Sequence, residues 1–295
     1  MSAFTLTCCS TADRPKSFFD AREIPYACFH WSEGGVDHLD DLYQSITPEE
    51  FYGAIKAGAE PTTSQVSVGE FVALWEPVAA GGSDVLHVSL SSGLSGAYNA
   101  ATLAASQVEA AHPGRRVLVV DSLGASSGYG MLVEYLADLR DAGASLDEAH
   151  TWALAHRLNV HHWFFSTDLT SYVRGGRVSR VSGFVGTALR ICPVLDMNDE
   201  GRLIPRDKIR TKAKAERDVV ARMGEHAEGG LAYAGKCSIS QGACREDAER
   251  VRDLVEERFR ALRGKVTISD IGTVIGSHTG PGTVALYFMG DTRGR

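Results

Sequence analysis

The sequence predicts an α/β protein of two domains, on the basis of a repeated local pattern and the chain length. An apolar run at 85–90 is typical of a buried strand, and a turn of small residues and an alanine-rich helix from Ala97 follow it. The same order recurs in a strand at 116–120, a small-residue loop and an amphipathic helix at 131–139. Each strand, loop and helix is half of a βαβ unit, which predicts a parallel sheet. The 295 residues are enough for two domains with cores of their own.

Residues 1–159 are predicted to form the N-terminal domain, a Rossmann-like unit around that parallel sheet. We expect short strands at 4–8 and 24–31, and between them Ser10 and Asp13 have the spacing of a capping box at a helix start. Three further helices are expected to begin directly after a capping residue, at Thr47, Ser67 and Ser145.

Residues 160–295 are predicted to form a second α/β domain, because a new strand signal begins at His161. The elements expected after this strand are a helix at 168–173, a short helix at 184–189, a hairpin of strands at 192–197 and 202–209, a strand at 231–234, a helix at 243–262, a strand at 265–271 and a last strand at 283–289. A glycine-rich loop that carries His278 is expected before the last strand.

Composition narrows the possible functions. The formal net charge of −7 argues against a general nucleic-acid binder. The six cysteines follow no metal-binding spacing, which suggests free thiols in a reducing cytoplasm. No signal peptide is recognised, and no run approaches the ~20 apolar residues of a membrane span. No metal site is expected, because His161 and its neighbour His162 on a strand point to opposite faces.

Hydroxyl side chains gather where the strand at 85–90 ends. Ser91, Ser92 and Ser95 precede a helix start, which offers free N–H groups to a small anion. The alternative is that Ser95 only caps the helix. Thr63 and Ser64 precede a capping box without being part of it. They are either a second donor set facing Ser95 or solvated loop residues.

Basic residues offer two further anion sites. Arg174 and Arg177 flank a glycine pair, which combines cations with accessible backbone, although the glycines can simply end a helix. Between 202 and 217 basic residues dominate, and this segment is either a docking face for an acidic partner or a protected edge strand. The segment 230–237 nearly matches a phosphate-binding loop, but Cys237 stands where Ser or Thr is required. No ATP site and no other cofactor site is therefore expected.

Six short segments, taken in order, resemble those of a known family. They are Ser10-Thr11-Ala12-Asp13, Thr63-Ser64-Gln65, Leu90 to Gly96, Val120-Asp121-Ser122, Arg174-Gly175-Gly176-Arg177 and Ile275 to Gly282. Together they resemble the DegV family of bacterial fatty-acid-binding proteins. The resemblance implies a two-domain α/β fold with a lipid tunnel between or beneath the domains.

The resemblance also implies how the ligand is bound and used. It implies that hydroxyls matching Thr63 and Ser95 hold the carboxylate of a long-chain fatty acid, with Arg177 and His278 near that head group. Ser64 and Ser92 complete the expected ligand-binding set. A separate fatty acid kinase would phosphorylate the bound acid, making an acyl phosphate for phospholipid synthesis. This chain departs from the family pattern at Cys9, where an Asp is usual, and its basic segment lacks a common glycine.

Two other functions are compatible with the same residues. Gly93 to Ala97 resembles the nucleophile elbow of α/β-hydrolases except at its last position, and Ser95, Asp270 and His278 occur in the order of a catalytic triad. The lack of an upstream HGGG-type oxyanion loop argues against a hydrolase. A lipid-sensing regulatory module without a kinase partner is the third possibility.

Overall fold

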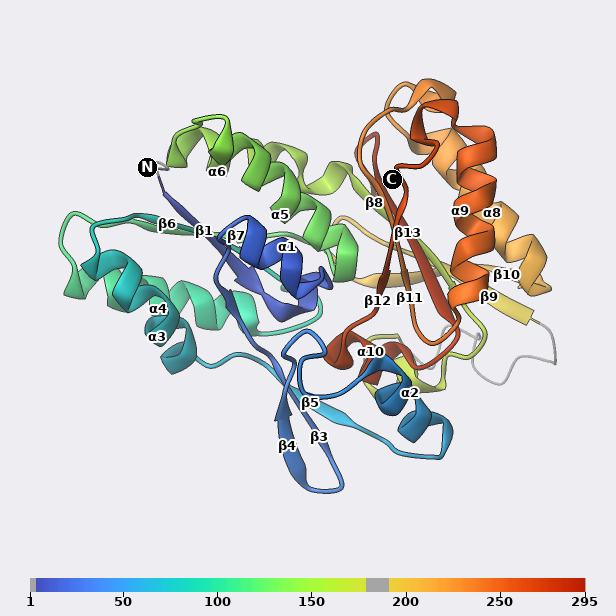
Figure 1. Ribbon diagram of the computed structural model, residues 1–295, viewed down its shortest axis with the longest axis horizontal. Coiled ribbons are helices and arrows are strands. Elements are labelled where there is room, and N and C mark those ends of the chain that lie inside the picture. The colour runs from blue at the N-terminus through green and yellow to red at the C-terminus, as the bar shows by residue number, and fades with distance from the viewer. Residues whose placement is uncertain (1–3, 179–190, 295) are drawn as a thin grey trace.

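The computed structural model describes residues 4–178 and 191–294, so the short helix expected at 184–189 lies outside the described residues. A four-stranded sheet forms the first part of the molecule (Figure 1). Its strands, all parallel, are in spatial order β2 (Tyr26–Ala27), β1 (Thr5–Cys9), β6 (Val85–Ser89) and β7 (Val117–Asp121). The predicted parallel sheet is confirmed.

A six-stranded sheet forms the second part, and every strand in it lies after residue 159. Its spatial order is β10 (Leu203–Arg210), β9 (Ile191–Met197), β8 (Val160–Ser166), β13 (Thr283–Met289), β11 (Cys237–Gln241) and β12 (Thr267–Asp270). Only the β11–β12 pair is parallel. The expected β9–β10 hairpin is confirmed, and it leaves β10 at an edge of the sheet.

A small antiparallel sheet projects below the other two (Figure 1). Its central strand β3 (His30–Glu33) pairs with β4 (Val36–Leu39) on one side and with β5 (Thr62–Ser64) on the other. Because side chains alternate along a strand, Thr63 is half-buried between its exposed neighbours Thr62 and Ser64.

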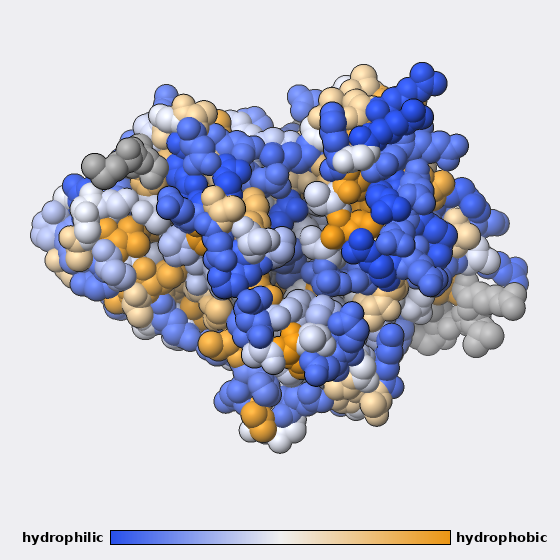
Figure 2. All heavy atoms as spheres, in the orientation of Figure 1, coloured by the Kyte–Doolittle hydropathy of each residue, from blue (hydrophilic) through white to orange (hydrophobic). Residues whose placement is uncertain are grey.

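Helices cover both faces of the parallel sheet, and α8 and α9 cover one face of the six-stranded sheet (Figure 1). Their bounds are α1 Lys16–Ala21, α2 Pro48–Lys56, α3 Val68–Ala80, α4 Ala97–Ala111, α5 Ser126–Asp141, α6 Leu146–His156, α7 Thr170–Arg174, α8 Lys212–His226, α9 Arg245–Arg258 and α10 Thr273–Thr279. The predicted caps of α2, α3 and α6 are confirmed at Thr47, Ser67 and Ser145, and each of them forms a capping box. The surface over α9 is strongly hydrophilic (Figure 2).

Helix α5 lies between the two large sheets (Figure 1). The first half of this helix is buried on all sides, and buried apolar residues continue into its second half. These buried apolar residues are Met131, Leu132, Val133, Leu136 and Ala137. One hydrophobic cluster therefore runs from Leu6 and Val88 in the parallel sheet to Phe165 and Phe288 in the six-stranded sheet.

Four local predictions were wrong. The strand expected at 24–31 is split between two sheets, because the chain leaves the parallel sheet after Ala27. The segment 10–13 forms one short 3₁₀ turn, which ends where Asp13 adopts a left-handed conformation. The strand expected at 231–234 is a 3₁₀ turn in its first half.

The fourth concerns His278, which lies on helix α10 rather than in a loop. The neighbouring Gly276 is required by packing, since a Cβ there would lie 2.7 Å from the hydroxyl of the buried Tyr52.

Candidate functional site

A cavity opens where the small sheet, the loop after β6 and helix α10 meet the six-stranded sheet. Its volume of about 220 Å³ is more than ten times the roughly 15 Å³ that one water molecule needs. Most of its lining is apolar, and the apolar residues are Phe29, Leu90, Leu94, Ala125, Phe164, Met197, Leu203, Ile271, Val274, Ile275 and Ala285. Such a cavity suits a largely apolar small molecule.

Polar side chains gather in one part of the lining. Thr63 from β5, Ser95 from the loop before α4 and His278 from α10 all line the cavity. Thr63 Oγ1 and His278 Nε2 lie within hydrogen-bond distance, at 2.8 Å. Ser95 Oγ accepts a hydrogen bond from the N–H of Ala97, which leaves the Ser95 hydroxyl proton free to donate. The N-cap of α4 is Gly96 and has no side-chain cap, so the alternative in which Ser95 caps this helix is wrong.

Arg177 connects two of these segments. It follows α7, and its guanidinium donates to the carbonyl oxygens of Gly175 and, at 3.1 Å, of Leu94. Burial lowers the pKa of Arg177 without removing its charge at neutral pH. The arginine therefore places a positive charge beside the polar part of the cavity while tying α7 to the loop after β6.

Two glycines allow the polar segments to approach one another. A Cβ on Gly175 would collide with Nδ1 of His278, and a Cβ on Gly96 would lie 2.5 Å from the side-chain oxygen of Gln65. Gln65 lines the cavity and was not among the expected ligand-binding residues, although it belongs to the matched segment at 63–65.

Burial keeps the His278 ring neutral. Desolvation is the main cause that lowers its pKa to about 4, and the positive charges of Arg177 and Arg174 add to it. Its Nδ1 is buried and has no hydrogen-bond partner among the described residues. A neutral ring with one free nitrogen can position a proton without adding a full charge to the site.

We expect the titration of His278 to follow from this environment. An unfolded histidine titrates near 6.5, so between pH 6.5 and about 4 the unfolded chain binds more protons. The stability linked to this ring is therefore complete above pH 6.5 and is lost as the pH falls towards 4. Histidine-resolved NMR titration measures the pKa of His278. In Arg177→Gln this pKa should rise, because one positive charge that lowers it is removed. An unshifted titration in that variant would show that Arg177 does not act on the ring.

Ser64 and Ser92 differ in where the structure places them. Ser64 is exposed but lines the cavity, so it stays beside the other expected residues. Ser92 is exposed and lies outside the cavity lining, and its backbone N–H donates to Asp121 at 3.1 Å. Ser91 is buried, with its hydroxyl donating to the carbonyl of Gly201 at 2.8 Å. Of the three serines in this turn, only Ser95 reaches the cavity.

Ser95, Asp270 and His278, the residues of the hydrolase alternative, do not form a catalytic triad. His278 contacts Thr63 through Nε2, and Asp270 lies outside the cavity lining, where its carboxylate accepts a hydrogen bond from Gln241. Ser95 is not among the described residues with a positive φ, so the strained conformation of a nucleophile elbow is not found there.

The segment 10–13 supports the cavity wall from behind. Ser10 Oγ accepts from the N–H of Phe29 at 3.1 Å, and the Asp13 carboxyl accepts from Ser126, so both residues hold groups that line the cavity. Burial and the nearby Asp40 carboxyl raise the pKa of Asp13 well above its usual range. Cys9, at the position of the family Asp, is fully buried, with its Sγ 3.8 Å from Nε2 of His87.

Several lining residues of the six-stranded sheet follow a pattern that sequence reasoning did not use. Thr283, Ala285 and Tyr287 alternate along β13, and His162 and Phe164 alternate along β8. Side chains two residues apart share one face of a sheet, so this period could have indicated which residues of each strand face a ligand. It could not have indicated that the two strands are neighbours.

Fold and cavity together define an α/β protein with a largely apolar cavity that is lined in part by polar side chains. Residues 6–291 match the family model described as uncharacterised protein, DegV family, and the chain belongs to that family. A DegV domain-containing protein of Clostridium perfringens is 32% identical over 295 residues, covering 99% of each chain.

Two solved structures extend the comparison. One, described as fatty acid binding of a DegV family protein from Thermus thermophilus, is 28% identical with a TM-score of 0.85 and covers 98% of this chain and all of that one. The other, a DegV lipid-binding protein from Thermotoga maritima, is also 28% identical, with a TM-score of 0.79 over 99% of this chain and all of that one. The predicted family and its two-domain fold are confirmed.

Proposed function

We propose that this chain binds one long-chain fatty acid, with the acyl tail in the apolar part of the cavity and the carboxylate at Thr63, Ser95 and His278. The observation that carries the proposal is the lining itself, which is largely apolar and includes the hydroxyls of Thr63 and Ser95 and the imidazole of His278 from three separate segments. The fatty-acid and lipid binding described for the Thermus and Thermotoga proteins supports it.

The energetics agree with a nearly enclosed tail. Burial of a sixteen-carbon tail contributes on the order of 12 kcal/mol, at ~0.8 kcal/mol per methylene. Association costs roughly 4–15 kcal/mol, so a partly exposed tail would bind weakly. A bare carboxylate is expensive to remove from water, and hydrogen-bond donors at the polar end offset this cost.

The head-group contacts follow from the donors available. With the His278 proton on Nε2, the ring donates to Thr63, and the Thr63 hydroxyl is free to donate to a carboxylate oxygen. Ser95 supplies a second hydroxyl proton. Arg177, fixed by two carbonyl oxygens beside the site, would stabilise the additional negative charge of an acyl phosphate.

The phosphoryl group is proposed to come from a separate fatty acid kinase. The segment 230–237, which nearly matches a phosphate-binding loop, does not have the structure of one. It begins with a 3₁₀ turn, and Lys236 forms ion pairs of 2.8 Å with Glu134 and Asp138. Exposed basic side chains of the edge strand β10, at Arg206, Lys208 and Arg210, offer a face for such a partner. The acyl phosphate would then enter phospholipid synthesis.

A cytoplasmic location is part of the proposal. All six cysteines are unpaired, which is the usual state in a reducing compartment. No helix in the described part of the chain has the length and apolar character that a bilayer crossing requires.

Native mass spectrometry of the purified chain tests the ligand. We expect a co-purified mass equal to one long-chain fatty acid, which organic extraction removes and added fatty acid restores. A chain that neither carries nor takes up fatty acid would refute the binding proposal. Incubation of the loaded chain with ATP and cell extract freed of coenzyme A, followed by trapping with hydroxylamine, tests the kinase separately. Formation of ADP together with the hydroxamate indicates an acyl phosphate, whereas an acyl adenylate, which also yields the hydroxamate, would release pyrophosphate and AMP.

A further inference from the structure

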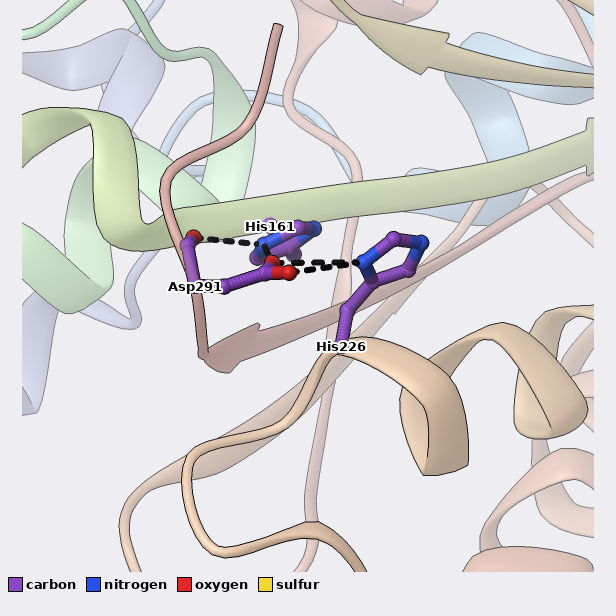
Figure 3. A group of neighbouring side chains, drawn as sticks. All are labelled: His161, His226 and Asp291. Atoms are coloured by element: carbon purple, nitrogen blue, oxygen red, sulfur yellow. Dashed lines mark hydrogen bonds and ion pairs between the residues drawn. The ribbon is translucent and has the colours of Figure 1, made fainter. Parts of the chain in front are cut away.

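Three potential metal ligands, His161, His226 and Asp291, point toward one another beside strand β8 (Figure 3). His161 Nε2 lies 3.0 Å from the Asp291 carboxylate, and His226 Nδ1 lies 3.2 Å from the same oxygen. One ligand atom from each residue lies within 4.8 Å of the others. No other group of three such side chains comes this close in residues 4–178 and 191–294.

The fold brings these residues together from three separate elements. His161 lies at the start of β8, His226 is the last residue of α8, and Asp291 follows β13. The N–H of Asp291 donates to the carbonyl of His226 at 3.0 Å, which fixes the spacing of two of the ligands. A Cβ on Gly290 would collide with that same carbonyl oxygen and approach the His161 ring to 2.9 Å, so the cluster requires glycine there.

The donor set matches the chemistry of a borderline divalent cation. Two imidazole nitrogens and one carboxylate oxygen are typical ligands of Zn²⁺, which also accepts a water at a fourth position. The carboxyl end of α8 adds a favourable partial negative charge beside His226.

Two of the three arginines beside the cluster pair with other carboxylates, and no arginine in the described residues pairs with Asp291. Arg206, Arg222 and Arg293 line the same hollow, whose volume is about 590 Å³. Arg206 pairs with Asp196 at 2.8 Å, and Arg222 pairs with Asp207 at 2.6 Å. Arg293 donates to the carbonyl oxygens of Asn198 and Leu123. The Asp291 carboxylate therefore remains available to a cation.

We propose that His161, His226 and Asp291 bind one divalent transition-metal ion of the zinc class. On binding, His161 exchanges its 2.9 Å contact with the Asp291 backbone oxygen for the ion, and its ring proton moves to Nδ1. The ion would join the start of β8, the end of α8 and the segment after β13. The site uses none of the residues of the fatty-acid proposal, since His161, His226 and Asp291 do not line the acyl cavity, although His162 and Met197 line both that cavity and the hollow of the cluster.

Calorimetric titration of the chelator-treated full chain with ZnCl₂ tests this inference. We expect one equivalent to bind, with affinity at least tenfold lower in His226→Ala and in Asp291→Ala, whose side chains are partly exposed and tolerate replacement. The matched control is His112→Ala, because His112 forms a similar 2.7 Å pair with Glu76 without a third ligand. Zn²⁺ should also raise the melting temperature of the original chain but not of the two variants.

Co²⁺ provides an independent readout, since a four-coordinate site gives strong visible absorption that either ligand variant should lose. Absence of a bound equivalent in the original chain would overturn the proposal. So would equal Zn²⁺ binding in the original chain and in the ligand variants, because the ion would then lie elsewhere.

Discussion

Simultaneous replacement of Thr63 and Ser95 by alanine is expected to weaken fatty-acid binding by roughly 100-fold or more. A hydrogen bond to a charged group contributes about 1.5–3 kcal/mol, so loss of two costs about 3 kcal/mol or more. The carboxylate would also remain partly removed from water without those donors. Both side chains are half-buried and lie in a cavity, so their truncation should leave the fold intact.

Fluorescent fatty-acid displacement on the delipidated chain measures this effect, and native mass spectrometry confirms it. The matched control is Thr62→Ala/Ser92→Ala, which removes the same two residue types from the same strand and turn. Both of these side chains are exposed and lie outside the cavity lining. If the control weakened binding as much as Thr63→Ala/Ser95→Ala, the head group would not be held where we place it.

Filling the apolar part of the cavity is expected to change which acyl chains bind. Ala285 lies on β13, is 4% exposed and lines the cavity. In Ala285→Phe the added ring would occupy space that a tail needs. Displacement of four methylenes costs about 3 kcal/mol, or roughly 200-fold in affinity, at ~0.8 kcal/mol each. We therefore expect sixteen- and eighteen-carbon acids to bind far more weakly, while ten- and twelve-carbon acids keep most of their affinity.

A displacement series over acids of ten to eighteen carbons measures the shift. Extra volume in a packed region costs about 1–3 kcal/mol of stability, so the melting temperature is recorded for each variant. Ala110→Phe, on the exposed face of α4, is the control for the substitution itself. An unchanged chain-length profile in a folded Ala285→Phe protein would place the tail somewhere else.

The elements predicted from sequence are those that local chemistry determines. The helices after Thr47, Ser67 and Ser145 need only a cap and an acid three residues later, and all three form as predicted. The strand, small-residue turn and helix around Ser95 are equally local. In contrast, the glycines around His278 suggested a loop, whereas Gly276 is small because Tyr52 packs against it.

The candidate site required information that no single segment carries. The resemblance indicated Thr63, Ser95, Arg177 and His278, and all four line one cavity. Whether Ser92 or Ser95 faces that cavity depends on how the turn is held by Asp121, which sequence spacing does not encode. His161, His226 and Asp291 lie 65 residues apart in succession, on elements whose adjacency is set by the order of strands in the six-stranded sheet.

Helix α5 has a consequence for how the molecule unfolds. Its sequence belongs to the N-terminal half, yet its apolar side chains are covered by both large sheets. Separating the halves would expose Met131 and Leu132 to water at a cost of about 1.5–3 kcal/mol for each side chain. The boundary near Asn159 thus divides the strands between sheets without dividing the chain into two independently stable bodies, and melting should be a single cooperative transition.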